Sequence, residues 1–188
     1  MNLLYHVQKR KATYLISIFL TNKERFYRIV SLIPAETEKR ISPQFKKRLN
    51  ELIEDLEITK YEFSKLVKIS VPVITRATIY GIIPSLRPLI KMADYFHVSL
   101  EYLLGDVDKD NFYQSDNPTT FHIRLAELTK EKETTYAEIA HRMPFTKTYF
   151  YEWQQQKTLP SLEYLIALAE DFHVSIDYLL GRTDDRHN

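Results

Sequence analysis

The chain has 188 residues, of which 44% are hydrophobic and 13% aromatic, a content that suits packed cores and excludes wholesale disorder. It contains no cysteine, which excludes disulfides, thiolate catalysis and cysteine-ligated zinc, and its three glycines offer no glycine-rich phosphate-binding loop. The formal net charge is only +1, but residues 1–44 carry 8 basic and 3 acidic side chains, so positive charge gathers at the start.

Residues 1–41 form an N-terminal extension that matches no other part of the chain. Its apolar run, residues 14–20, is far shorter than the ~20 residues that a membrane span needs. A basic cluster precedes this run, but no small-residue cleavage site follows it, so we expect a soluble, cytoplasmic protein. Residues 21–24 form a capping box ahead of apolar residues at helical spacing. The extension is expected either to dock on the rest of the chain or to form a homodimer contact.

An internal repeat organises the rest of the chain. Residues 45–105 align with residues 121–181 at a constant offset of 76, and 22 of the 61 pairs are identical. The identities gather in "F..RL.EL", in "PSL" and in the closing phrases "FHVSLEYLLG" and "FHVSIDYLLG". Residues 63–83 share no identity with residues 139–159. The sequence therefore predicts a duplicated unit whose copies keep a scaffold and differ in one central stretch.

Local signals predict five short helices in each copy, and hence an all-α fold. Ser42 precedes Pro43 as an N-cap with proline at the first helical position. "TKYE" at residues 59–62 and "TYAE" at residues 135–138 are capping boxes. Further expected caps recur in pairs, with glycine ending the last helix of each copy and histidine the fourth: Ser70 and Thr146, Ser85 and Ser161, Ser99 and Ser175, Gly105 and Gly181, His97 and His173.

This order of capped helices, followed by "PSL" and "VS.(D/E)YLLG", resembles the Cro/cI-type helix-turn-helix domain of the XRE family, which has a lambda-repressor-like fold. The resemblance implies two tandem five-helix domains, residues 42–105 and 121–181. A polar linker, residues 106–120, would join them, and a polar tail, residues 182–188, would follow. It further implies that the third helix of each domain lies in the major groove of double-stranded DNA.

In the first repeat the resemblance places the recognition helix at about residues 71–80. Arg76 is the strongest candidate for base recognition, because arginine can donate two hydrogen bonds to guanine, worth about 1–3 kcal/mol of discrimination. Ile74 falls on the opposite face and is expected in the core. The other expected DNA contacts of this repeat are Val71, Pro72, Val73 and Thr75 on the third helix and Lys60 at the start of the second helix, where it would meet a phosphate.

In the second repeat the recognition helix would run over about residues 147–156. Its outward-facing residues would be Lys147, Thr148, Tyr149 and Tyr151, with Tyr136 at the phosphate position of the preceding helix. Phe150 and Trp153 are expected to be buried or partly buried.

Two departures set the second repeat apart from the family pattern. Where the family has a turn glycine, this chain has Lys68 and Pro144, and proline cannot adopt a positive φ, so the second turn must be built differently. Glu152, equivalent to Arg76, would repel phosphate.

These features predict a sequence-specific DNA-binding transcriptional regulator, most simply a repressor, that uses one or both repeats. The chain lacks the usual catalytic and nucleotide-binding motifs, so neither an enzyme nor a cofactor is expected. The alternative is a protein-binding module on a helix-turn-helix scaffold, such as an antirepressor, an antitoxin or an inhibitor of a nucleic-acid-binding enzyme. The acidic second repeat and the apolar third helix of the first favour that alternative.

Overall fold

A computed structural model describes residues 40–187, so the expected role of the N-terminal extension in docking or dimerisation lies almost wholly outside the described residues. The described part consists of ten helices and no strand, apart from an isolated antiparallel bridge between Ile41 and Ile82. The all-α prediction is confirmed for this part of the chain. None of these ten helices is long and apolar enough to cross a membrane.

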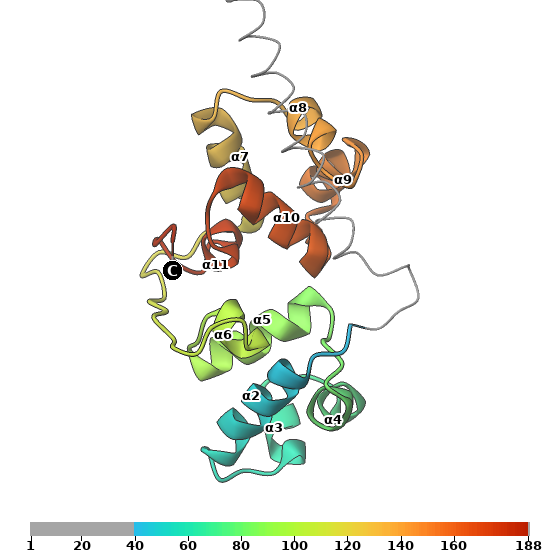
Figure 1. The fold of residues 1–188 in the computed structure, drawn as a ribbon, viewed down its shortest axis with the longest axis vertical. Coiled ribbons are helices and arrows are strands. Elements are labelled where there is room, and N and C mark those ends of the chain that lie inside the picture. The colour runs from blue at the N-terminus through green and yellow to red at the C-terminus, as the bar shows by residue number, and fades with distance from the viewer. Residues whose placement is uncertain (1–39, 188) are drawn as a thin grey trace, which may run out of the picture.

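The helices follow the repeat, five in residues 42–105 (the first repeat) and five in residues 121–181 (the second repeat) (Figure 1). Those of the first repeat are α2 (Pro43–Glu54), α3 (Lys60–Leu66), α4 (Val71–Tyr80), α5 (Leu86–Phe96) and α6 (Leu100–Leu104). Those of the second repeat are α7 (Phe121–Glu131), α8 (Tyr136–His141), α9 (Thr148–Gln156), α10 (Leu162–Phe172) and α11 (Ile176–Leu180).

Most of the predicted helix ends are confirmed. Both capping boxes are complete, because Thr59 and Thr135 each accept from the amide three residues on while Glu62 and Glu138 accept in return. Those bonds lower the pKa of Glu62 and Glu138, the backbone bond contributing most. His97 and His173 end α5 and α10 in the left-handed conformation, at φ 55° and 57°. The repeated histidines are therefore helix caps, as predicted.

One predicted cap is wrong and two are incomplete. Lys147, and not Thr146, is the N-cap of α9, because the turn before α9 runs longer than its counterpart in the first repeat. Ser70 and Ser85 occupy the N-cap positions of α4 and α5, but their hydroxyls make no capping hydrogen bond.

The residues that are identical in the two repeats carry the scaffold. Phe45 in the first turn of α2 and Phe121 at the start of α7 are fully buried, and so are the equivalent leucines that follow them, Leu49 and Leu125. Arg48 lies 3.9 Å from the ring centroid of Tyr102, and Arg124 lies 4.1 Å from that of Tyr178. Such cation–π contacts stabilise by about 0.5–2 kcal/mol each, which gives a physical reason for keeping both partners in both copies.

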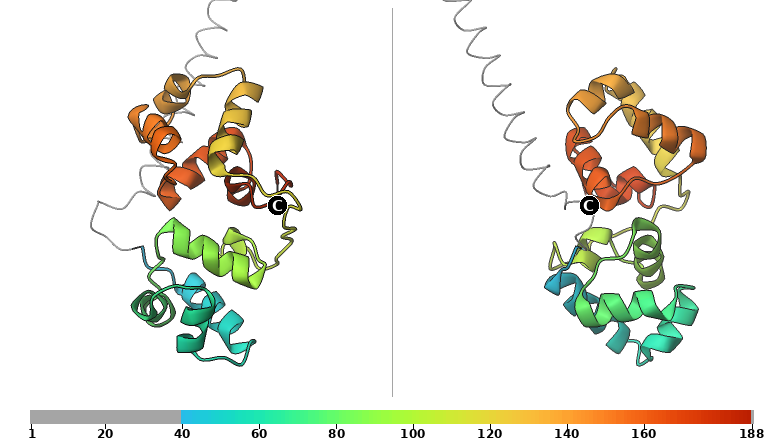
Figure 2. Two further views of the ribbon diagram at one scale, coloured as in Figure 1. Left: turned by 180° about the vertical axis from the view of Figure 1, so that it is seen from behind. Right: turned by 90° about the vertical axis from the view of Figure 1, so that its right-hand side faces the viewer.

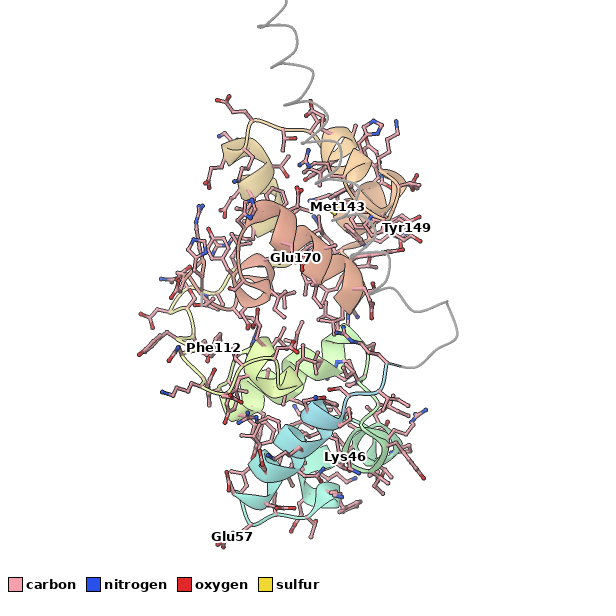
Figure 3. All side chains as sticks on the ribbon, viewed as in Figure 1. Lys46, Glu57, Phe112, Met143, Tyr149 and Glu170 are labelled. Carbon is pink, nitrogen blue, oxygen red and sulfur yellow. The ribbon has the colours of Figure 1, made fainter. Side chains whose placement is uncertain are left out.

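The linker and the tail contact each other, and the tail also contacts α7. Ser115 N donates to Arg182 O at 2.9 Å, and the Arg182 guanidinium lies 4.6 Å from the ring centroid of Phe112. Figure 3 shows Phe112 on the side of the molecule away from α4 and α9. In the tail, Asp184 pairs with Arg124 of α7 at 3.2 Å.

The two repeats meet through their last helices. α5 and α6 of the first repeat face α10 and α11 of the second across the middle of the molecule (Figure 2), and α6 contacts α11 directly. The third helices, α4 and α9, lie toward the same side of the long axis (Figure 1).

Candidate nucleic-acid interface

In the first repeat, α3 and α4 form a compact helix–turn–helix pair. Phe63 on α3 and Ile74 on α4 are fully buried and anchor the two helices in the core. Lys68 occupies the turn at φ 53°, the left-handed conformation expected at this position, and Ile69 N closes the turn on Ser64 O at 3.0 Å. The hydrophobic spacing of α4 therefore fixes which of its faces is left for a ligand.

The exposed face of α4 carries side chains that the sequence predicted as DNA contacts. Val71, Pro72 and Arg76 are exposed, Thr75 is half-buried, and Val73 is half-buried against the core. Lys60, the first residue of α3, is also exposed. The six candidates of the first repeat therefore lie on α3 and α4. Val73, which packs against the core, is the least accessible of them to a DNA duplex.

Arg76 is held in place by its own helix. Its Nε donates to the carbonyl oxygen of Pro72 at 3.1 Å. This bond orients the planar guanidinium and leaves the two Nη groups to donate elsewhere. A guanidinium that is already oriented loses less side-chain entropy when it binds a base or a carboxylate.

The second repeat builds the same turn from different parts. Residues 142–147 separate α8 from α9, whereas only residues 67–70 separate α3 from α4. No residue of the longer turn has a positive φ. Phe145 fills the turn, packing on Phe150, Trp153 and Tyr164 with ring centroids 5.5, 5.3 and 4.6 Å away. The prediction that Pro144 forces another construction is confirmed.

An ion pair braces this longer turn. Arg142 Nε and Nη2 donate to the two carboxylate oxygens of Asp171 on α10, at 3.0 and 2.8 Å. The equivalent positions of the first repeat hold Leu66 and Tyr95. The second repeat therefore ties its turn to the core by a bidentate charge pair that the first repeat does not have.

The outer face of α9 is aromatic. Lys147, Thr148, Tyr149 and Tyr151 are exposed, while Phe150 and Trp153 are buried, as predicted. Tyr149, labelled in Figure 3, remains 38% exposed although its ring packs against those of Phe145 and Tyr164.

Tyr136 makes both a ring contact and a side-chain hydrogen bond within the second repeat. Its ring stacks on Phe150 with centroids 4.9 Å apart, and its hydroxyl accepts from Gln154 Nε2 at 3.0 Å. Burial raises the pKa of the Tyr136 hydroxyl, which therefore stays neutral. A phosphate contact by this group would have to share the hydroxyl with Gln154.

Four large apolar side chains that the sequence did not single out are exposed on the second and third helices of the first repeat. Ile79 and Tyr80 at the end of α4 are 47% and 61% exposed, and Tyr61 and Leu66 on α3 are 59% and 50% exposed. With Val71 they make five exposed residues, which we call the α3–α4 apolar residues. The signal was available, because none of these residues falls on the helical stripe that holds Phe63, Ile74 and Ala77.

Comparison with known proteins gives one partial likeness. Over 62 residues the chain is 34% identical to the uncharacterized HTH-type transcriptional regulator YobD of Bacillus subtilis (strain 168). The match covers 33% of this chain and 55% of that protein. No protein-family model and no solved structure match the chain. One third of this chain, whose described residues form helices and no strand, is therefore similar to part of a helix-turn-helix transcriptional regulator.

Proposed function

We propose that the protein is a sequence-specific regulator of transcription, acting as a repressor, that binds double-stranded DNA through two tandem five-helix helix-turn-helix domains of the XRE type. In this proposal α4 of the first repeat reads the major groove. The observation that carries it is Arg76, exposed and oriented by Pro72 O on a helix whose opposite face is anchored in the core. The partial likeness to a transcriptional regulator supports the same reading.

The two repeats are proposed to make different kinds of DNA contact. The first offers Arg76 and Lys60, two exposed cations that suit guanine and phosphate. The second has Glu152 where the first has Arg76, and its α9 exposes Tyr149 and Tyr151. We therefore assign sequence reading to α4 and a weaker backbone contact to α9. Because α4 and α9 lie toward the same side of the molecule, a single duplex could meet both (Figure 1).

The proposal is tested by selecting bound duplexes from a randomised pool with the full chain. The affinity of the selected duplex is then measured across a salt series. We expect one enriched motif, and an affinity that falls steeply with salt because phosphate contacts release counterions. Failure of the folded protein to enrich any motif would contradict the proposal.

Matched variants separate base reading from phosphate contact. Arg76→Ala should cost about 1–3 kcal/mol at one base pair and relax the sequence preference there. Arg76→Lys keeps the charge but not the fork of donors, so it should relax that preference with little change in the salt slope. Lys60→Ala should weaken all duplexes alike and reduce the salt slope by about 1. An unchanged motif in Arg76→Ala would show that α4 is not the reader.

A second candidate function rests on the α3–α4 apolar residues. Large apolar side chains that stay exposed on a folded chain can be covered by a protein partner. The alternative is thus a helix-turn-helix scaffold that binds another protein, as an antirepressor, an antitoxin or an inhibitor of a nucleic-acid-binding enzyme. Tyr80→Ala tests the alternative, because it removes one exposed ring of these residues and leaves Arg76 in place. A loss of partner binding with unchanged DNA binding would support the alternative.

A further inference from the structure

The contact between the two repeats is reciprocal. Leu100 N, at the start of α6, donates to Asp177 Oδ2 at 2.8 Å, and Ile176 N, at the start of α11, donates to Glu101 Oε1 at 3.2 Å. Leu100 is equivalent to Ile176 in the repeat, and Glu101 to Asp177. The acid of each repeat therefore caps the last helix of the other, which relates the two helices by an approximate two-fold axis.

The charges around this contact are not reciprocal. Arg182 is buried and donates through Nη1 to the Asp177 carboxylate, through Nε to Asp94 at 2.8 Å and through Nη2 to Val98 O at 3.0 Å. The equivalent position in the first repeat is Asp106. Asp177 thus has a buried cation beside it, while Glu101 has none from its own repeat.

The buried Asp177, the partly buried Glu101 and one arginine leave a charge to be neutralised. Asp177 lies near enough to Glu101 for its charge to act on that carboxyl, and Glu101 Oε2 is buried and accepts no hydrogen bond from any described residue. Two carboxylates cannot hydrogen-bond, because neither carries a proton to donate. If Glu101 is protonated, its hydroxyl donates to Asp177 and the lone oxygen is satisfied.

The environment of Glu101 favours that proton. Burial, followed by the charge of Asp177 and the hydrogen bond with it, raises the pKa of Glu101 to about 8 from an ordinary value of 4.5. Arg186, the other arginine beside Glu101, is already paired with Glu131 at 2.6 Å. The remaining titratable groups that line the depression next to Glu101 are Asp106, Glu170, His173 and His187.

We propose that Glu101 and Asp177 share one proton and that this proton locks the two repeats in a single relative orientation. When the proton leaves, two buried carboxylates face each other across the approximate two-fold axis with Arg182 able to compensate only one of them. The repulsion and the cost of desolvating the second charge then favour separation of α6 from α11. This inference goes beyond the proposed function, since it holds whatever α4 and α9 bind.

The direction of the pH dependence follows from linkage. The pKa of Glu101 is higher in the closed protein than in an opened or unfolded one, so closing the interface takes up a proton. The lock is complete below the ordinary pKa of 4.5, weakens as pH rises above it, and is lost as pH passes through about 8. Within that window the closing equilibrium should change by up to about tenfold per pH unit.

The test measures the orientation of the repeats in the full chain. Because the chain has no cysteine, Glu54→Cys on α2 and Lys130→Cys on α7, two exposed and equivalent positions, accept spin labels specifically. We expect a narrow distribution of label-to-label distances near neutral pH that broadens as pH rises through about 8. An infrared band of a protonated carboxyl should disappear over the same pH range.

The isosteric variant Glu101→Gln supplies the sharp control. Glutamine keeps the oxygen that accepts from Ile176 N and places an amide donor against Asp177, so it imitates the protonated acid. In this variant the distribution of label-to-label distances should stay narrow at every pH, and the infrared band of the protonated carboxyl should be absent. Asp106→Asn, a neighbouring exposed acid, should keep the wild-type pH dependence.

A second variant covers the case in which Glu101→Gln does not fold. Asp177→Asn removes the charge that opposes ionisation of Glu101, so the midpoint of broadening should move to lower pH. A distance distribution that does not change with pH in the wild-type protein would overturn the proposal. So would a pH dependence that persists in Glu101→Gln, or a midpoint that stays in place in Asp177→Asn.

Discussion

The second and third helices of the two repeats solve one structural problem in two ways. The first repeat joins α3 to α4 through a short turn and accepts one residue, Lys68, in the left-handed conformation. The second repeat joins α8 to α9 through residues 142–147, with no positive φ, and supports that turn by the Phe145 ring cluster and the Arg142–Asp171 pair. The same scaffold therefore accepts either a short turn with one strained residue, as in the first repeat, or a longer unstrained turn held by tertiary contacts, as in the second.

The largest expected loss of stability comes from truncating the equivalent buried residues of the two third helices, Phe150 of α9 and Ile74 of α4. Phe150→Ala should cost about 3–5 kcal/mol of unfolding free energy, because it leaves a cavity beneath Tyr136, Phe145 and Trp153. The equivalent variant of the first repeat, Ile74→Ala, should cost about 2–5 kcal/mol. Both losses would be measured by urea unfolding followed by circular dichroism.

The same experiment shows whether the repeats unfold together. Trp153, the only tryptophan of the chain, lies in the second repeat, so its fluorescence reports on that repeat alone. Because the repeats share buried hydrogen bonds through Leu100 and Asp177, we expect Ile74→Ala to shift the fluorescence and the circular dichroism transitions equally. A fluorescence midpoint that does not move would mean that the repeats unfold independently.

An intermediate effect is expected where the second turn is braced. Arg142→Ala removes both donors to Asp171, whose side chain is only 6% exposed, and should cost about 1–2 kcal/mol, between the values for exposed and buried pairs. Leu66→Ala, the equivalent change in the first repeat, removes a half-exposed side chain and should stay within about 0.5 kcal/mol. Equal losses in the two variants would contradict the view that only the second turn depends on this position.

The last two effects, of opposite sign, concern the residue that follows each third helix as its C-cap. Gly81 has φ 68°, and a Cβ there would lie 2.7 Å from Ser42 O, so Gly81→Ala should cost at least about 1–2 kcal/mol. Lys157 holds the equivalent position at φ 52°. Lys157→Gly relieves that strain and should stabilise by up to about 1 kcal/mol, since the greater entropy of unfolded glycine offsets part of the gain. Thermal unfolding of the two variants should therefore shift in opposite directions.

Much of the fold could be predicted because its signals are local. Capping boxes at Thr59 and Thr135, histidine and glycine at the helix ends, and the leucine spacing are each read within a few residues of the chain. The same locality gave the orientation of α4 and α9, with Ile74, Phe150 and Trp153 inward. The cap at Thr146 was wrongly predicted because the length of the second turn depends on where Phe145 finds ring partners, which lie on other helices.

The sequence by itself determined the duplication, the all-helical class and the face of each third helix, because these follow from periodicity and from capping chemistry. Only the tertiary structure decided which carboxylates meet. Glu101 and Asp177 occupy unremarkable positions in two copies of a short motif, and they become a buried acid pair because α6 packs on α11. Burial and the approach of charges from distant parts of the chain set protonation, and neither can be read from neighbouring residues.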